Sequence, residues 1–175
     1  MEARVVKSDG ILLVGMSFYG DPFERASAWD EDNEIGALWK RFGSYCAAEP
    51  SAVAARADDG TVGYELHIRH AETAKTGRYE VFVGVEVRSL EAVPIRLSAK
   101  VLPPADYAVI TVRAYEMDGD WMRKMFEEVV PGLGRSVDEA AAFSFERYDE
   151  RFRGMDTLAE SAFDYYIPLS PRAGS

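Results

Sequence analysis

Glu146 and Tyr148 lie two residues apart in an apolar stretch near the C-terminal end of the chain, residues 143–148. Side chains alternate along a β-strand, so a strand here would place both on one face and Phe145 and Arg147 on the other. A carboxylate beside an aromatic ring suits an organic cation, because each ring face contributes about 0.5–2 kcal/mol and a poorly solvated carboxylate adds Coulomb attraction. An exposed strand face, with Glu146 solvated beside Arg147, is the alternative.

Further aromatic residues could line a pocket for such a ligand. The chain has nine Tyr, nine Phe and three Trp, which favours an aromatic-lined pocket in addition to an ordinary core. Residues 163–169 are a predicted terminal strand in which Tyr165 and Tyr166 face opposite ways, so one of them would point into any cavity. Core packing is the alternative for each ring. The candidates beside Glu146 are Tyr148, Tyr166, Trp39, Tyr64 and Phe82.

Metal and covalent chemistry have little support in the sequence. His67 and His70 lie three residues apart on a predicted strand, so their imidazoles would diverge rather than share an ion. Cys46 is the single cysteine, which excludes an internal disulfide and a thiolate cluster. Motifs typical of serine hydrolases, phosphate-binding loops, dinucleotide-binding proteins and zinc proteins do not occur. We therefore predict no metal site and no cofactor.

The composition excludes two classes of partner. Twenty Lys and Arg face thirty Asp and Glu, a net charge of −10, whereas nucleic-acid binding needs clustered basic residues. The longest apolar runs, such as residues 11–14 and 81–85, are far shorter than the roughly 20 residues of a membrane helix. The N-terminus has no apolar signal-peptide core. We expect a cytoplasmic protein that binds neither nucleic acid nor membrane directly, and whose acidity allows a cationic or neutral ligand.

The elements that must position these residues follow the same order in each half of the chain. In the first half, residues 4–17 are strand-like around a turn at Asp9-Gly10, and a polar loop continues to Asp32. Asn33 is a predicted helix N-cap, and an apolar stripe carries the helix to Glu49-Pro50. Residues 63–70 and 79–87 are predicted to pair as a β-hairpin. The stripe consists of Ile35, Leu38, Trp39 and Phe42.

The second half repeats this order. Residues 106–114 alternate as a strand does, and a turn at Asp118-Gly119-Asp120 leads into a helix over residues 121–130. Residues 142–148 and 163–169 are the next two predicted strands. The repetition predicts an α+β fold over residues 1–175, internally duplicated as strand–helix–strand–strand units with pseudo-repeats 1–92 and 93–175. The expected architecture is an antiparallel sheet with helices on one face and a ligand cleft between the halves.

Six short motifs, taken in order, resemble the GyrI-like effector-binding domain family, which occurs at the C-terminus of some AraC- and MerR-type regulators and also as free-standing proteins. The resemblance covers nearly the whole chain. Ala105, Asp106 and Val81 depart from residues usual in the family, which leaves the shape of the pocket open. The motifs are Leu12–Met16, Glu34–Phe42, Tyr79–Val87, Leu102–Val109, Phe145–Tyr148 and Tyr166–Leu169.

The resemblance implies a duplicated fold whose members bind small, often cationic and aromatic molecules in a cleft between the halves. It assigns Glu146 to the floor of that cleft, and Trp39, Tyr148 and Tyr166 to its aromatic walls. The first family strand begins within ten residues of Met1, so we expect no helix-turn-helix before the domain. The implied partner is a small organic ligand, cationic or aromatic, with a protein partner or a homodimer left open.

Three functions remain open at this stage. The first is a stand-alone sensor or sequestrant of small molecules, with Glu146 as counter-ion and no catalytic residue. The second is a hydrolase, because some free-standing members of the resembled family hydrolyse strained electrophilic rings. Glu146 would then be the general base, and Tyr148 or Tyr166 the acid. The third is an inhibitory protein-interaction module, in which the acidic surface meets a basic partner.

Overall fold

The computed structural model describes residues 1–24, 33–117 and 119–172. The predicted polar loop up to Asp32 and the first residue of the predicted turn at Asp118 therefore lie partly outside the described residues. The chain divides into two compact units. The continuous unit is residues 11–102, and the split unit combines residues 1–10 with residues 103–175.

The continuous unit contains four antiparallel strands in the order β5, β2, β4, β3. The predicted hairpin is present as β3 and β4, in which Leu66 pairs with Phe82. Helix α1 covers one face of this sheet, and its contacts are with β2 and β4. The elements are β2 (Ile11–Gly20), α1 (Glu34–Ala48), η1 (Pro50–Val53), β3 (Gly63–Ile68), α2 (Thr73–Thr76), β4 (Tyr79–Glu86) and β5 (Ser98–Leu102).

Helix α1 begins where the sequence predicts. The side chain of Asn33 accepts a hydrogen bond from the backbone N–H of Gly36 at 2.8 Å, which satisfies one of the unpaired N–H groups of the first turn. Leu38 and Phe42 are buried against apolar side chains of β2 and β4, which form the core of this unit. No helix among the described residues is long and apolar enough to cross a membrane.

The split unit also contains four antiparallel strands, in the order β1, β6, β8, β7. Its helical segment occupies the place that the sequence predicts but is divided into three parts by a π-helical turn, and it extends past Pro131 to Gly132. The elements are β1 (Glu2–Ser8), β6 (Ala105–Arg113), η2 (Ala114–Glu116), α3 (Trp121–Lys124), η3 (Met125–Val129), α4 (Val130–Gly132), β7 (Phe143–Tyr148), η4 (Met155–Glu160) and β8 (Ala162–Pro168).

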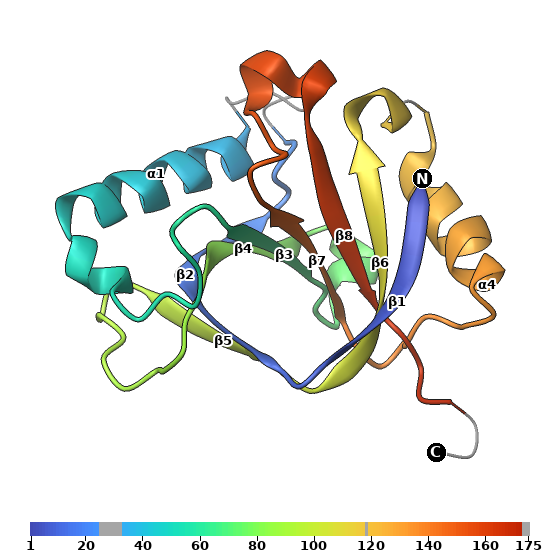
Figure 1. The fold of residues 1–175 in the computed structure, drawn as a ribbon, viewed down its shortest axis with the longest axis horizontal. Coiled ribbons are helices and arrows are strands. Elements are labelled where there is room, and N and C mark those ends of the chain that lie inside the picture. The colour runs from blue at the N-terminus through green and yellow to red at the C-terminus, as the bar shows by residue number, and fades with distance from the viewer. Residues whose placement is uncertain (25–32, 118, 173–175) are drawn as a thin grey trace. The chain divides into compact units, whose positions relative to one another are not determined.

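The two units share one plan, which confirms the predicted α+β class and the strand–helix–strand–strand order. Each unit adds a further edge strand to its first strand: β5 pairs with β2, and β1 pairs with β6. Figure 1 shows β1, in blue, beside the yellow β6, although about a hundred residues separate them. The unit limits therefore differ from the predicted repeats 1–92 and 93–175, because the first strand of the chain completes the second unit.

Candidate functional site

Glu146 lies on β7 of the split unit and is only 1% exposed. It pairs in register with Tyr165 of β8, so the two side chains share one face of the sheet. The hydroxyl of Tyr148 donates a hydrogen bond to the Glu146 carboxylate. The structure thus brings Glu146 and Tyr148 together, as their spacing on a strand predicts.

Aromatic rings of the same unit gather on the sheet face that carries Glu146. Trp121, at the start of α3, meets Phe163 edge-on at 6.4 Å between centroids and Tyr165 at 6.1 Å. The ring centroids of Tyr148 and Phe163 are 5.4 Å apart. The Tyr165 hydroxyl forms a 2.8 Å hydrogen bond with the hydroxyl of Ser144. We call Glu146 and the rings of Trp121, Tyr148, Phe163 and Tyr165 the Glu146 cluster.

Tyr166, a predicted pocket residue, lies on the opposite face of the same sheet. Its ring stacks on Phe145 at 4.5 Å and meets Tyr107 edge-on at 5.9 Å. Burial raises the pKa of Tyr166, and it raises the pKa of Tyr107 to about 12. The structure therefore does not bring Tyr166 to Glu146. Neighbouring residues of a strand point to opposite faces, and Tyr165 is the one on the face that carries Glu146.

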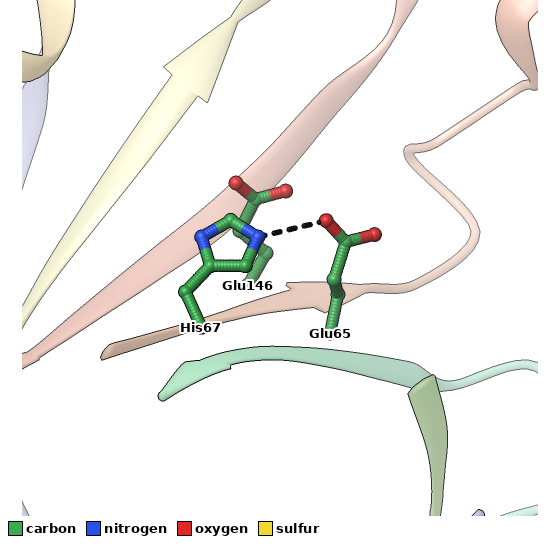
Figure 2. A group of neighbouring side chains, drawn as sticks. All are labelled: Glu65, His67 and Glu146. Atoms are coloured by element: carbon green, nitrogen blue, oxygen red, sulfur yellow. Dashed lines mark hydrogen bonds and ion pairs between the residues drawn. The ribbon is translucent and has the colours of Figure 1, made fainter. Parts of the chain in front are cut away.

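The continuous unit carries a second buried carboxylate, Glu65 on β3, which is 3% exposed. The indole N–H of Trp39 donates to it at 2.7 Å, and Nε2 of His67 lies 3.0 Å from its other oxygen. Figure 2 shows this Glu65–His67 interaction as a dashed line. The His67 ring also meets Tyr79 edge-on at 5.7 Å. We call Glu65, Trp39, His67 and Tyr79 the Glu65 cluster.

The other two predicted pocket residues of the continuous unit lie away from Glu65. The hydroxyl of Tyr64 donates to Glu86 at 2.6 Å, and the fully buried Phe82 packs over Gly15 and Gly84. Both belong to the set of alternate residues that face away from α1. Of the three candidates in this unit, the structure places only Trp39 beside a buried charge.

Six residues of these clusters are not among the predicted pocket residues: Glu65, His67, Tyr79, Trp121, Phe163 and Tyr165. The predicted duplication holds a signal for Glu65, since the strand that follows the helix in each unit, β3 or β7, carries one buried glutamate on its helix-covered face. Trp121 likewise corresponds to Trp39, because each is an aromatic residue that its helix directs toward the sheet. His67 and His70 diverge as predicted, His67 meeting Glu65 and His70 lying 3.4 Å from Glu80.

The chain is similar in sequence to a known protein family and to a transcriptional regulator. Residues 4–169 match the family described as "Cass2: Integron-associated effector binding protein". The transcriptional regulator BrlR of Pseudomonas aeruginosa is 27% identical over 172 residues, which are 97% of this chain and 56% of the regulator. The chain thus spans about half the length of this curated relative.

Solved structures share the fold at low identity. SAV2435, solved bound to tetraphenylphosphonium, aligns with a TM-score of 0.64 and 16% identity over 97% of this chain and 94% of its own. An integron cassette protein from the mobile metagenome of Vibrio cholerae aligns with a TM-score of 0.55 and 17% identity, over 96% of this chain and 95% of its own. The family match over residues 4–169 shows that the chain belongs to the Cass2 effector-binding proteins, within the GyrI-like effector-binding family that its motifs resemble.

Proposed function

We propose that the chain binds a small organic cation that carries aromatic groups, and that Glu146 is the counter-ion. One observation carries this proposal: a carboxylate that is 1% exposed accepts a hydrogen bond from Tyr148 and shares its sheet face with the ring of Tyr165, which Trp121 meets edge-on. Family membership supports the coarser statement that the ligand is a small molecule.

The buried environment of the Glu146 carboxylate favours a cation as its partner. Taking a carboxylate out of water is costly unless hydrogen bonds or an opposite charge compensate. The Tyr148 hydroxyl supplies one hydrogen bond and holds the carboxylate in place. A cation would add Coulomb attraction, strengthened by the low local dielectric, and contacts with ring faces worth about 0.5–2 kcal/mol each. A soft, poorly hydrated organic cation gains both at small desolvation cost, whereas an inorganic ion would lose its hydration.

The ligand of one relative belongs to the same chemical class. SAV2435 was solved with tetraphenylphosphonium, a cation with four phenyl rings. We take this compound as the first probe for the present chain. Tetraphenylborate has the same shape and the opposite charge, so it separates recognition of charge from recognition of rings.

The test measures tetraphenylphosphonium affinity by quenching of tryptophan fluorescence and by calorimetry, for the native chain and for Glu146→Gln. We expect Glu146→Gln to weaken binding by about tenfold or more, which corresponds to about 1.4 kcal/mol. Tetraphenylborate should bind weakly to both proteins. Glu127→Gln is the matched control, because Glu127 is an exposed glutamate of the same unit that pairs with Arg123.

Unchanged affinity in Glu146→Gln would refute the counter-ion role, provided that circular dichroism shows the variant folded. Equal binding of tetraphenylborate would show that the rings alone recognise the ligand. A protein that binds neither compound would leave the family's small-molecule class intact but contradict the proposed ligand chemistry.

Hydrolysis is the second candidate, and the Tyr148–Glu146 hydrogen bond favours it, because a carboxylate base beside a hydroxyl acid is the pairing that such a reaction needs. Incubation with epoxide- or cyclopropane-bearing cations, followed by mass spectrometry, distinguishes it from binding. A product heavier by one water molecule, formed by the native chain and not by Glu146→Gln, would establish turnover.

A further inference from the structure

The split unit carries a pocket of about 620 Å³. Its floor is the face of the sheet that carries Thr111 and Asp164, which is the face opposite to Glu146. Strands β1, β6 and β8 supply this floor, and the segment between β7 and β8 supplies a wall. The pocket is therefore separate from the Glu146 cluster and lies entirely within one unit.

Four arginines line this pocket, from three separate parts of the unit, in a chain whose net charge is −10. Three glutamates accompany them, Glu2, Glu150 and Glu160. The lining residues alone thus carry 4 − 3 = +1, and Asp149, Asp164 and Glu116 pair with three of the arginines from outside the lining. The arginines are Arg4, Arg113, Arg151 and Arg153.

Two of these arginines are held in place from below by Asp164, which is 3% exposed. Arg4 and Arg151 approach its carboxylate at 3.1 and 3.0 Å, and the Thr111 hydroxyl donates to it at 2.7 Å. Burial disfavours the charged Asp164, but the hydrogen bonds from Arg151 and Thr111 outweigh it, so the pKa of Asp164 lies below its ordinary value. Asp149 also pairs with Arg151 at 2.8 Å, so the two guanidinium groups are oriented before any ligand arrives.

The other two arginines are held only loosely. Arg113 lies 4.0 Å from Glu116, and Arg153 lies 3.0 Å from Glu160 in a pair that is about two-thirds exposed on both sides. Exposed ion pairs of this kind contribute between about 0 and 1 kcal/mol, so an incoming anion can replace the glutamate at little cost. Guanidinium groups bind carboxylate and phosphate oxygens in pairs, which adds geometric selectivity.

Tyr115 lies at the same pocket and is 70% exposed. An exposed aromatic ring next to arginines provides a stacking surface for a planar ligand. The volume falls within the roughly 300–1,000 Å³ that is typical of small-molecule sites, which is larger than a single inorganic ion requires. We propose that this pocket binds a small aromatic anion through its phosphate or carboxylate group, with Arg113 and Arg153 as the groups that turn to the ligand.

The experiment titrates the full chain with two probes, adenosine 5′-phosphate for the phosphate group and 2-naphthoate for the carboxylate group. Adenosine and 2-naphthol are the matched uncharged compounds. Binding is followed by calorimetry and by chemical-shift changes of the backbone amides. We expect the Arg113→Gln/Arg153→Gln double variant to weaken the better probe by about tenfold or more, and Tyr115→Leu to weaken it several-fold. The exposed Arg123→Gln, which lies outside the pocket, should leave it unchanged.

Binding of either probe with this pattern supports the proposal, and the stronger probe identifies the anionic group. The proposal is overturned if neither probe binds below roughly 10 mM, if the uncharged compounds bind equally well, or if the double variant retains native affinity. Tetraphenylphosphonium binding is the second control, because the Arg113→Gln/Arg153→Gln double variant should retain it. The thermal midpoint of each variant checks that it is folded.

Discussion

Glu65 and Glu146 are both buried carboxylates, and each accepts a hydrogen bond from an aromatic side chain of its own unit. Trp39 donates to Glu65 through its indole N–H, and Tyr148 donates to Glu146 through its hydroxyl. An aromatic side chain that donates a hydrogen bond fixes the carboxylate and also places its ring beside it. Such fixed groups recognise a ligand with little ordering cost, since they are already in place when the ligand arrives.

Asp164 allows a prediction about stability and pH. Asp164→Asn removes the shared counter-charge of Arg4 and Arg151, which are partly exposed, and Arg151 keeps Asp149, so we expect a loss of about 1–2 kcal/mol at neutral pH. The folded-state pKa of Asp164 lies below 3.8, so its stabilisation is complete above that pH and disappears as the pH falls through the folded-state value. Urea unfolding between pH 2 and 7 should therefore show the native and variant curves converging in acid. Asp120→Asn, at an exposed position, is the control.

At the level of single strands, the pairing register decides which aromatic residues share a face. Glu146 lies opposite Tyr165, and Phe145 lies opposite Tyr166. A shift of β8 by one residue would exchange the faces of Tyr165 and Tyr166. The same alternation separates Glu65 from Tyr64 on β3. Adjacent aromatic residues in the sequence are therefore poor guides to one pocket until the partner strand is known.

Gly15 and Gly84 allow the β2 and β4 backbones to pack closely, which predicts the effect of a substitution on stability. They lie opposite each other in register, and a Cβ atom at Gly15 would collide with the backbone carbonyl of Val83 and with the ring of Phe82. We expect Gly15→Ala to destabilise the protein by about 3 kcal/mol, because the strand backbone cannot move without breaking the ladder. Chemical denaturation measures this. Gly43→Ala in α1 is the matched control, since a Cβ there meets open space and should stabilise by up to about 1 kcal/mol.

Across the whole chain, the main organisational feature is that the N-terminal strand completes the C-terminal unit. Strand β1 pairs with β6 through its full length, from Glu2 opposite Thr111 to Ser8 opposite Ala105. The N-terminal amine also forms an ion pair with Glu116. One unit is therefore continuous in sequence, and the other is closed only when both ends of the chain are present.

Deletion of residues 2–9 tests this arrangement. The variant loses β1 and the Arg4–Asp164 ion pair, and it leaves the edge of β6 without its partner. We expect the thermal midpoint to fall by about 5 °C or more, and a synthetic peptide of residues 1–10 to restore part of the loss when added in trans. An unchanged midpoint would show that β1 contributes nothing to the split unit.

Local signals sufficed for most elements. The Asn33 cap, the stripe of α1 and the period-two runs of β3, β4, β6, β7 and β8 depend on neighbours within a few residues, so their positions are confirmed. Strand β5 was not predicted, because five residues before two prolines hold too little pattern, and Val101 on it is 63% exposed. Strand β5 forms because its backbone pairs with β2 on the side of β2 that β4 does not occupy.

The sequence by itself determined the α+β class and the duplicated order of elements. It also placed Glu146 and Tyr148 on one face of a strand, since each of these follows from local periodicity and spacing. Only the tertiary structure decided that Tyr165 and not Tyr166 shares a sheet face with Glu146, that Trp39 donates to a buried Glu65, and that arginines from three parts of the chain meet at one pocket. These outcomes depend on register and on contacts between residues far apart along the chain, and the free energy of such contacts is set by the assembled sheet rather than by any single segment.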